Sequence, residues 1–143
     1  MRHHSMYCAA LLFYCAFIMS GCAVSTCSRR KMAPYNRETY MTVKGSITSI
    51  DTVFNKKKKE DGLHLTVQSD SGEYVIHVCP QWYADKEHLK FKIGELLTVS
   101  GSKFIKDNKP NIYAASITCD TKESLHLRNP KTGDGIWDGR FYE

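Results

Sequence analysis

The sequence lacks the short motifs that mark the common enzyme families. It contains no Gly-rich phosphate loop, no Gly-x-Ser-x-Gly nucleophile motif and no His-Glu-x-x-His zinc motif. Its carboxylates are scattered through turns rather than paired on strands. These absences predict a protein that is not an enzyme, that has no catalytic residues and that carries no cofactor.

Long hydrophobic runs are also absent. The longest uncharged apolar segment, Tyr7 to Met19, is shorter than the ~20 residues of a membrane-spanning helix, but it follows the positive Arg2 and suits a signal peptide. The segment Met19-Ser20-Gly21-Cys22 then resembles the lipobox of bacterial lipoproteins. The resemblance implies cleavage before Cys22 and attachment of lipid to this cysteine. An uncleaved anchor and an ordinary secretory signal are the alternatives.

This leader predicts three regions and a compartment. Residues 1–21 form a lipoprotein signal peptide, residues 22–38 a flexible tether without apolar periodicity, and residues 39–143 the folded domain. The lipid bilayer is then a partner through the acylated Cys22, and the domain is lipid-anchored in the cell envelope, facing the periplasm. Removal of residues 1–21 takes away Arg2 and no acid, so the net charge falls from +5 to +4. This balance is too small to imply nucleic acid, which is an unlikely partner.

Alternating apolar and polar residues predict an all-β domain with one short helix. The expected strands are residues 40–54, 63–70, 73–79, 95–104, 111–118 and 124–128, and the helix lies within residues 80–90. Gly45 interrupts the first strand and predicts a bulge or a bend. The order resembles the OB-fold, a five-stranded partly open barrel, with the helix between strands three and four and an appended C-terminal strand. Another small barrel or a sandwich is the alternative.

The hairpin at residues 63–79 is expected to bury one face. With Ser71-Gly72 placed at the turn, five side chains share the core face: Leu65, Val67, Tyr74, Ile76 and Val78. The opposite face carries His64, His77 and Cys79, and this register puts His64 across from Cys79. The polar face is the first place to look for a function.

Two histidines and a cysteine on that face define the metal hypothesis. Imidazole and thiolate from His64, His77 and Cys79 can bind zinc or copper if they converge. A fourth ligand, His126 or Asp120, requires the last strand to lie nearby. The spacing matches no ligand motif, so the simpler interpretation is a pair of ordinary histidines on a polar sheet face.

Cys79 and Cys119 end the third and fifth expected strands. These strands lie parallel and adjacent in an OB-fold, which favours a disulfide between the two cysteines in an exported protein. Side-chain alternation opposes the bridge: if Tyr113, Ala115 and Ile117 face the core, Cys119 faces inward and Cys79 outward. Both outcomes remain open.

Four consecutive lysines, Lys56, Lys57, Lys58 and Lys59, fall in the loop between the first two strands. OB-folds use this loop to hold ligands, and with His64 and His77 the lysines are the candidates for ligand binding. An anionic polymer or an envelope protein is the expected partner. A solvated loop without a ligand is the alternative.

Aromatic residues extend this hypothesis. Trp82, Tyr83 and Tyr113 can stack on the rings of a single strand or a glycan beside a basic loop. Trp82 and Tyr83 are expected instead to cap the core from the short helix, with Leu89.

Several short motifs resemble a known group of proteins. They are Asp61-Gly62-Leu63-His64-Leu65, the run from Val75 to Tyr83, Val99-Ser-Gly-Ser102, Lys109-Pro110, Leu127-Arg128 and Gly135-Ile136-Trp137. They recur in this order in small exported bacterial OB-like domains that include the MamS/MamX-type domain of magnetosome proteins. The sequence departs from that group at Cys79, where glycine is expected, and in the lysine run. The resemblance implies the fold and carries over no catalytic residues.

The sequence therefore predicts a membrane-tethered bacterial lipoprotein that presents an OB-like binding or interaction module, with its ligand unnamed. A metal- or redox-linked envelope protein that uses His64, His77 and Cys79 is the alternative. A purely structural role in an envelope assembly is the third interpretation.

Overall fold

The computed structural model describes residues 35–120 and 123–138. The elements are η1 (Arg37–Thr39), β1 (Tyr40–Asn55), β2 (Glu60–Ser69), β3 (Gly72–Pro80), α1 (Gln81–Lys86), β4 (Leu96–Lys106), β5 (Lys109–Cys119), β6 (Leu125–His126) and η2 (Ile136–Asp138). The lipidation site Cys22, the signal peptide and most of the tether lie outside the described residues. Within them, no helix has the length and apolar character needed to cross a membrane.

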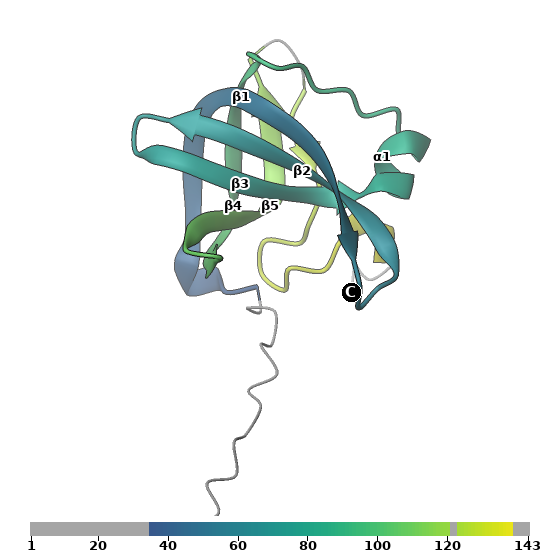
Figure 1. Ribbon diagram of the computed structural model, residues 1–143. Coiled ribbons are helices and arrows are strands. Elements are labelled where there is room, and N and C mark those ends of the chain that lie inside the picture. Colours follow the sequence, from purple (N-terminus) through teal and green to yellow (C-terminus); the bar gives the residue numbers. More distant parts are fainter. Residues whose placement is uncertain (1–34, 121–122, 139–143) are drawn as a thin grey trace, which may run out of the picture.

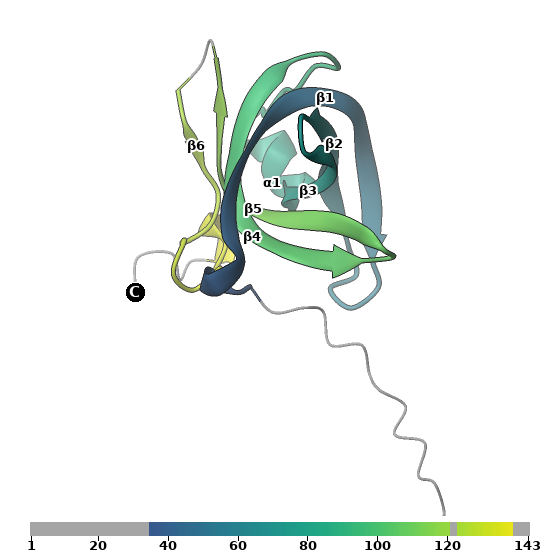
Figure 2. The ribbon, with the colours of Figure 1, turned by 90° about the vertical axis from the view of Figure 1, so that its left-hand side faces the viewer.

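The strands form the OB-like barrel that the sequence predicted (Figure 1). Their order is β3-β2-β1-β4-β5-β6, and a parallel pairing of β3 with β5 closes the first five into a ring. The closure is uneven, because β3 and β5 pair only from Val75 to His77 and from Asn111 to Tyr113. The short helix follows β3, and Figure 2 shows β6 outside the ring, beside β5.

β1 is long enough to serve both halves of the barrel. It pairs with β4 from Tyr40 to Ser46 and with β2 from Gly45 to Asn55, so it changes partner at Gly45. A Cβ at Gly45 would overlap the carbonyl group of Gln68, and only glycine allows the two strands to approach this closely. The predicted bend lies here, and a bulge follows between Ile47 and Ser49.

The core fills the ring with aliphatic side chains from every long strand. Leu65, Val67, Tyr74, Ile76 and Val78 are all buried, as the hairpin pattern predicted. Tyr83 and Leu89 pack against the core from the α1 end, which confirms two of the three residues of the predicted cap. The prediction is wrong for the third residue, Trp82. Its side chain is 48% exposed and donates a hydrogen bond from Nε1 to the Glu60 carboxylate at 3.2 Å.

The turn of the central hairpin differs from the predicted one by one residue. Ser69 pairs with Gly72, so Asp70 and Ser71 form the turn, and Gly72 follows it with a φ of +126°. Glycine is needed after the turn rather than within it. The shifted register places His64 across from His77, and the predicted pairing of His64 with Cys79 is wrong.

Two irregular positions change which side chains face inward. Val78 is an extra residue between the pairs Leu63–Cys79 and His64–His77, so Cys79 enters the core at 4% exposure instead of the polar face. In β5 the extra residue is Ala115. Ile112 and Ala114 before it and Ile117 and Cys119 after it are therefore all buried. Tyr113 faces outward, as the stacking hypothesis requires, and does not share the core face with Ala115 and Ile117.

Of the two outcomes left open for Cys79 and Cys119, the structure has the one without a disulfide. The parallel ladder of β3 and β5 ends at His77 and Tyr113, before it reaches either cysteine. The structure accordingly has Cys79 and Cys119 as separate, buried thiols.

Candidate functional site

A cleft of about 1250 Å³ opens on the outer face of the barrel, between the β1–β2 and β4–β5 hairpins. In Figure 1 these hairpins end at the lower right and lower left of the molecule. His64 and His77 lie in the cleft, with Tyr113 from β5 and Phe104 from β4. The C-terminal segment contributes Arg128 and Trp137. The β2–β3 face and these two loops are the surfaces that OB-folds use for oligonucleotides and oligosaccharides.

Four rings from four strands form a continuous row across the cleft, which we call the ring row: His64, His77, Tyr113 and Phe104. The centroids of His64 and His77 are 4.0 Å apart, and His77 meets Tyr113 edge-on at 5.1 Å. Tyr113 stacks on Phe104 at 4.2 Å, with an angle of 18° between the planes. The row exists because the β2–β3 and β3–β5 registers bring outward-facing residues into line.

Both histidines of the ring row are neutral near pH 7. Burial, together with the charges of Lys106 and Arg128, lowers the pKa of His64 to about 4. Burial and the neighbouring His64 lower the pKa of His77 to about 3. The two histidines of the row are therefore uncharged, and the charges of the cleft come from other residues, among them Lys106 and Arg128.

Asn111 fixes the tautomer of His77. The Asn111 amide donates from Nδ2 to the carbonyl oxygens of Lys109 at 2.9 Å and Lys106 at 3.4 Å, so its oxygen is directed at His77. That oxygen lies 2.9 Å from His77 Nε2, which must then carry the proton and donate. The hydrogen bond holds the ring in place, and Nδ1 keeps its lone pair.

Arg128 occupies the place where β3 and β5 separate. Its Nη1 donates to the carbonyl oxygens of His77 at 3.0 Å, Val78 at 2.9 Å and Ala114 at 2.6 Å. The backbone N–H groups of Leu127 and Arg128 both donate to the carbonyl of Ala115, the extra residue of β5. The β5 bulge thus docks the C-terminal segment, and the guanidinium joins the two strands where their ladder has ended.

The edges of the cleft carry more positive than negative side chains. The cations are Lys56, Lys57, Lys58, Lys106 and Arg128, and the acids are Glu60, Asp61 and Asp107. Glu60 is already engaged, by Trp82 and by Lys58 at 4.0 Å. Five cations against three carboxylates, one of them occupied, leave a cleft that favours an anion.

Exposed apolar side chains line the same hairpins. Phe54 is 59% exposed and Val53 40%, both near the end of β1, and Ile105 is 62% exposed on β4. All three line the cleft. The cleft thus combines charge with surfaces that gain from being covered.

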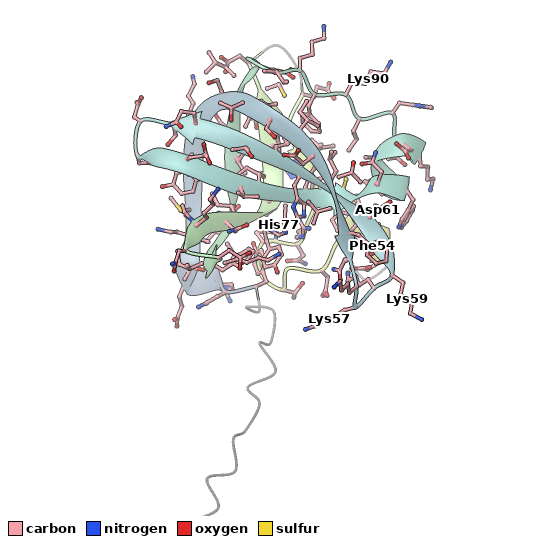
Figure 3. The ribbon with its side chains drawn as sticks, in the orientation of Figure 1. Phe54, Lys57, Lys59, Asp61, His77 and Lys90 are labelled. Carbon is pink, nitrogen blue, oxygen red and sulfur yellow. The ribbon has the colours of Figure 1, made fainter. Side chains whose placement is uncertain are left out.

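The predicted site residues come together only in part. Lys56, Lys57 and Lys58 line the cleft with both histidines, whereas Lys59 is not among its lining residues. Figure 3 shows Lys57 and Lys59 extending to opposite sides of the hairpin tip, and His77 near the middle of the face. The lysines are exposed, as the charge run predicted.

The hypothesis of a metal site formed by His64, His77 and Cys79 fails at the cysteine. Cys79 also borders the cleft, but it belongs to the core, and burial raises the pKa of its thiol to about 12. His126 and Asp120 are exposed and do not border the cleft. Across residues 35–120 and 123–138, no three His, Cys, Asp or Glu side chains are grouped to hold a metal ion.

Phe104, Lys106, Asn111, Arg128 and Trp137 join the site without having been predicted there. Arg128 and Trp137 do occur in the motifs Leu127-Arg128 and Gly135-Ile136-Trp137, which the family resemblance singled out without a role. Gly135 allows Trp137 to pack so closely that any Cβ there would overlap the indole ring. The pair Gly135 and Trp137 was therefore the sequence feature that could have indicated close packing of the C-terminal segment at this site.

Residues 39–124 match the model of the MamS/MamX magnetosome protein family. The chain belongs to this family. The match spans β1 to β5 and so includes the whole ring row, while Arg128 and Trp137 lie beyond it. No curated protein matches the chain significantly.

Proposed function

We propose that this MamS/MamX-family chain is a lipid-anchored protein of the bacterial envelope whose barrel is a binding module rather than an enzyme. Its ligand is an anionic polymer, held in the cleft between the β1–β2 and β4–β5 hairpins. The observation that carries the proposal is the combination, in one cleft, of the ring row with five cationic side chains.

The charges support an anionic ligand. Lys56, Lys57 and Lys58 stand on one hairpin and Lys106 on the other, so a long ligand meets cations at both ends of the cleft. The exposed lysines attract such a ligand through a field that falls off within ~8 Å at physiological ionic strength. Binding should therefore weaken as salt is added.

The rings support a polymer with flat faces, and an acidic polysaccharide fits best. Tyr113 and Phe104 stack on one another, and the buried, neutral His77 meets Tyr113 edge-on with His64 beside it. The faces of sugar rings pack on aromatic side chains without needing a charge. A polysaccharide is also a polymer that an envelope protein meets, whereas nucleic acid is not.

The leader supports the location. A lipid on Cys22 would hold the barrel at a membrane surface, with residues 23–34 between the lipid and the first described residue. The described domain is thus free to bind material close to that membrane.

The test is a titration of the full-length protein, purified in detergent, with two acidic polysaccharides, polygalacturonate and dextran sulfate, across a salt series. The variant Lys56→Ser/Lys57→Ser/Lys58→Ser should bind at least one of them about tenfold more weakly at low salt, and the difference should shrink at high salt. The variant Lys86→Ser/Lys90→Ser/Lys92→Ser is the matched control. It removes the same charge from exposed residues that do not border the cleft (Lys90 in Figure 3).

Three results would overturn the proposal. These are no binding of either polymer, equal losses in the two triple variants, and a loss that does not depend on salt. Anionic phospholipid vesicles serve as a third probe. If vesicles bind and neither polysaccharide does, the lysines contact lipid head groups and the polymer assignment is wrong.

A further inference from the structure

We propose that Arg128 is the carboxylate-binding residue of the cleft, so that the polymer carries its charges as carboxylates directly attached to sugar rings. This inference rests on the proposed function, because it names the chemical class of the same ligand. Arg128 lies just beyond residues 39–124, the range that matches the family model.

Arg128 is held rigidly by one end of its guanidinium. Nη1 alone makes the three hydrogen bonds to the carbonyls of His77, Val78 and Ala114. The rings of Tyr113 and Trp137 lie 5.6 Å and 4.9 Å from Cζ, in positions for cation–π contact. Backbone and rings together fix the plane of the group before any ligand arrives.

Among residues 35–120 and 123–138, the other edge of the guanidinium has no hydrogen-bond partner. Nε and Nη2 make no hydrogen bond within the described part of the chain, and neither is among its fully enclosed unpartnered atoms. No described carboxylate lies within 4.0 Å of the group. Arg128 is half-buried, and burial lowers its pKa to about 10, so the guanidinium is still charged at pH 7 and can pair with an anion.

That edge matches a carboxylate in shape. Nε and Nη2 present two parallel N–H groups, and the two oxygens of a carboxylate accept them as a bidentate pair. The lysines at the hairpin tips are point charges and supply no such geometry.

The ring row accounts for the sugar. Arg128 contacts Tyr113, and Tyr113 contacts both His77 and Phe104. A carboxylate bonded directly to a sugar ring brings that ring against the row while its oxygens meet Arg128. A sulfate or phosphate ester sets the ring further from its charge, so the two contacts compete.

The experiment uses the variant Trp82→Phe, which leaves Trp137 as the single tryptophan of the chain. Because Arg128 lies over the Trp137 ring, occupation of its free edge should change the tryptophan emission. Polygalacturonate is the probe, methyl-esterified polygalacturonate is the uncharged control, and dextran sulfate is the control with a different anion. Only polygalacturonate should produce a saturable change in emission.

In the Trp82→Phe protein, the further substitution Arg128→Lys tests whether the paired Nε and Nη2 donors bind the carboxylate. The ammonium has three donors for the three carbonyls, so the strands stay joined, but it lacks the second edge. Polygalacturonate affinity should fall about tenfold or more, because hydrogen bonds to charged groups are lost, and dextran sulfate affinity should stay within about twofold. A thermal melt checks that the variant is folded. If the variant is unfolded, the proposal is still tested by comparing the binding of polygalacturonate and dextran sulfate to the Trp82→Phe protein.

The outcomes separate the two proposals. If both acidic polymers bind equally and Arg128→Lys affects them alike, the inference fails while the proposed function stands. If dextran sulfate alone binds, the carboxylate assignment is also wrong. If neither binds, both proposals fall. Preferential binding of polygalacturonate that is lost in Arg128→Lys supports the inference.

Discussion

His64 lies directly across from His77 in the β2–β3 ladder, with their ring centroids 4.0 Å apart. Two protonated imidazoles at this separation would repel one another, and Lys106 and Arg128 add further positive charge. The pair is stable only while both rings are neutral. The charge of Asp51 raises the pKa of His64 slightly, and the hydrogen bond that His77 donates to Asn111 raises the pKa of His77, but burial outweighs both.

This pair makes the fold sensitive to acid. The pKa of each histidine is lowered on folding, from 6.5 to about 4 for His64 and to about 3 for His77. Between these values and 6.5 the unfolded chain binds protons that the folded chain does not, so the free energy of unfolding should fall as pH is lowered from about 6.5 to about 4. Each pKa unit corresponds to ~1.4 kcal/mol, so the loss should reach the order of a few kcal/mol.

Urea denaturation across this pH range measures the effect. Carboxylates also titrate there, so the wild-type curve is compared with that of His64→Gln/His77→Gln. The double variant should show a clearly smaller slope, while the exposed His126→Gln should keep the wild-type slope. Parallel curves for wild type and the double variant would show that the pair does not govern acid stability.

The sequence predicted the barrel and half of the cleft because both depend on local patterns. Alternation identified the buried face of Leu65, Val67 and Ile76, and four adjacent lysines had to be exposed. Register was harder to predict. A turn displaced by one residue and an extra residue at Val78 moved Cys79 from the outer face into the core.

The sequence left the orientation of Tyr113 open and assigned Arg128 no role, for a related reason. Tyr113 faces outward only because a bulge at Ala115 reverses the alternation that Ile117 would otherwise impose. Arg128 reaches the cleft because the same bulge presents a carbonyl to its backbone N–H. Bulges follow from contacts between distant strands and leave little trace in local sequence.

Truncation of the core side chain Ile76 tests the assignment of the hairpin faces. Ile76 has 0% exposure, and Ile76→Ala should cost on the order of 2–5 kcal/mol in the free energy of unfolding. Glu73→Ala, at an exposed position of the same strand, should stay within about 0.5 kcal/mol. Chemical denaturation of the two variants side by side makes the comparison. Equal losses would mean that the buried face is assigned wrongly.

Cys22 lies outside the described residues, and its lipidation is a prediction of the sequence alone. Cys22→Ala should leave the protein without lipid and release it from membranes, because the leader is too short to serve as a spanning helix. Metabolic labelling with a fatty acid, followed by membrane fractionation, measures both effects. Cys27→Ala is the matched control and should stay labelled. Undiminished label in Cys22→Ala would exclude this site.

Gly101 connects the stability of the barrel to the shape of the cleft. It lies at the β4–β5 register shift, and a Cβ at this position would overlap the backbone carbonyl of Tyr113. Neither strand can yield without moving Tyr113, which stacks on Phe104 and contacts His77. Gly101→Ala should therefore cost on the order of 3 kcal/mol or more, in the range of mutations that force strain into a core.

Gly62→Ala is the control for that substitution. A Cβ at Gly62 meets nothing closer than His64 Nε2 at 3.4 Å, which is ordinary contact, so the cost should be about 1 kcal/mol or less. Thermal melts rank the two variants. Because Gly62 also borders the cleft, Gly62→Ala further shows whether polymer binding tolerates a methyl group there. If Gly101→Ala is as stable as wild type, the close approach of β4 to β5 at Tyr113 is not a constraint on the fold.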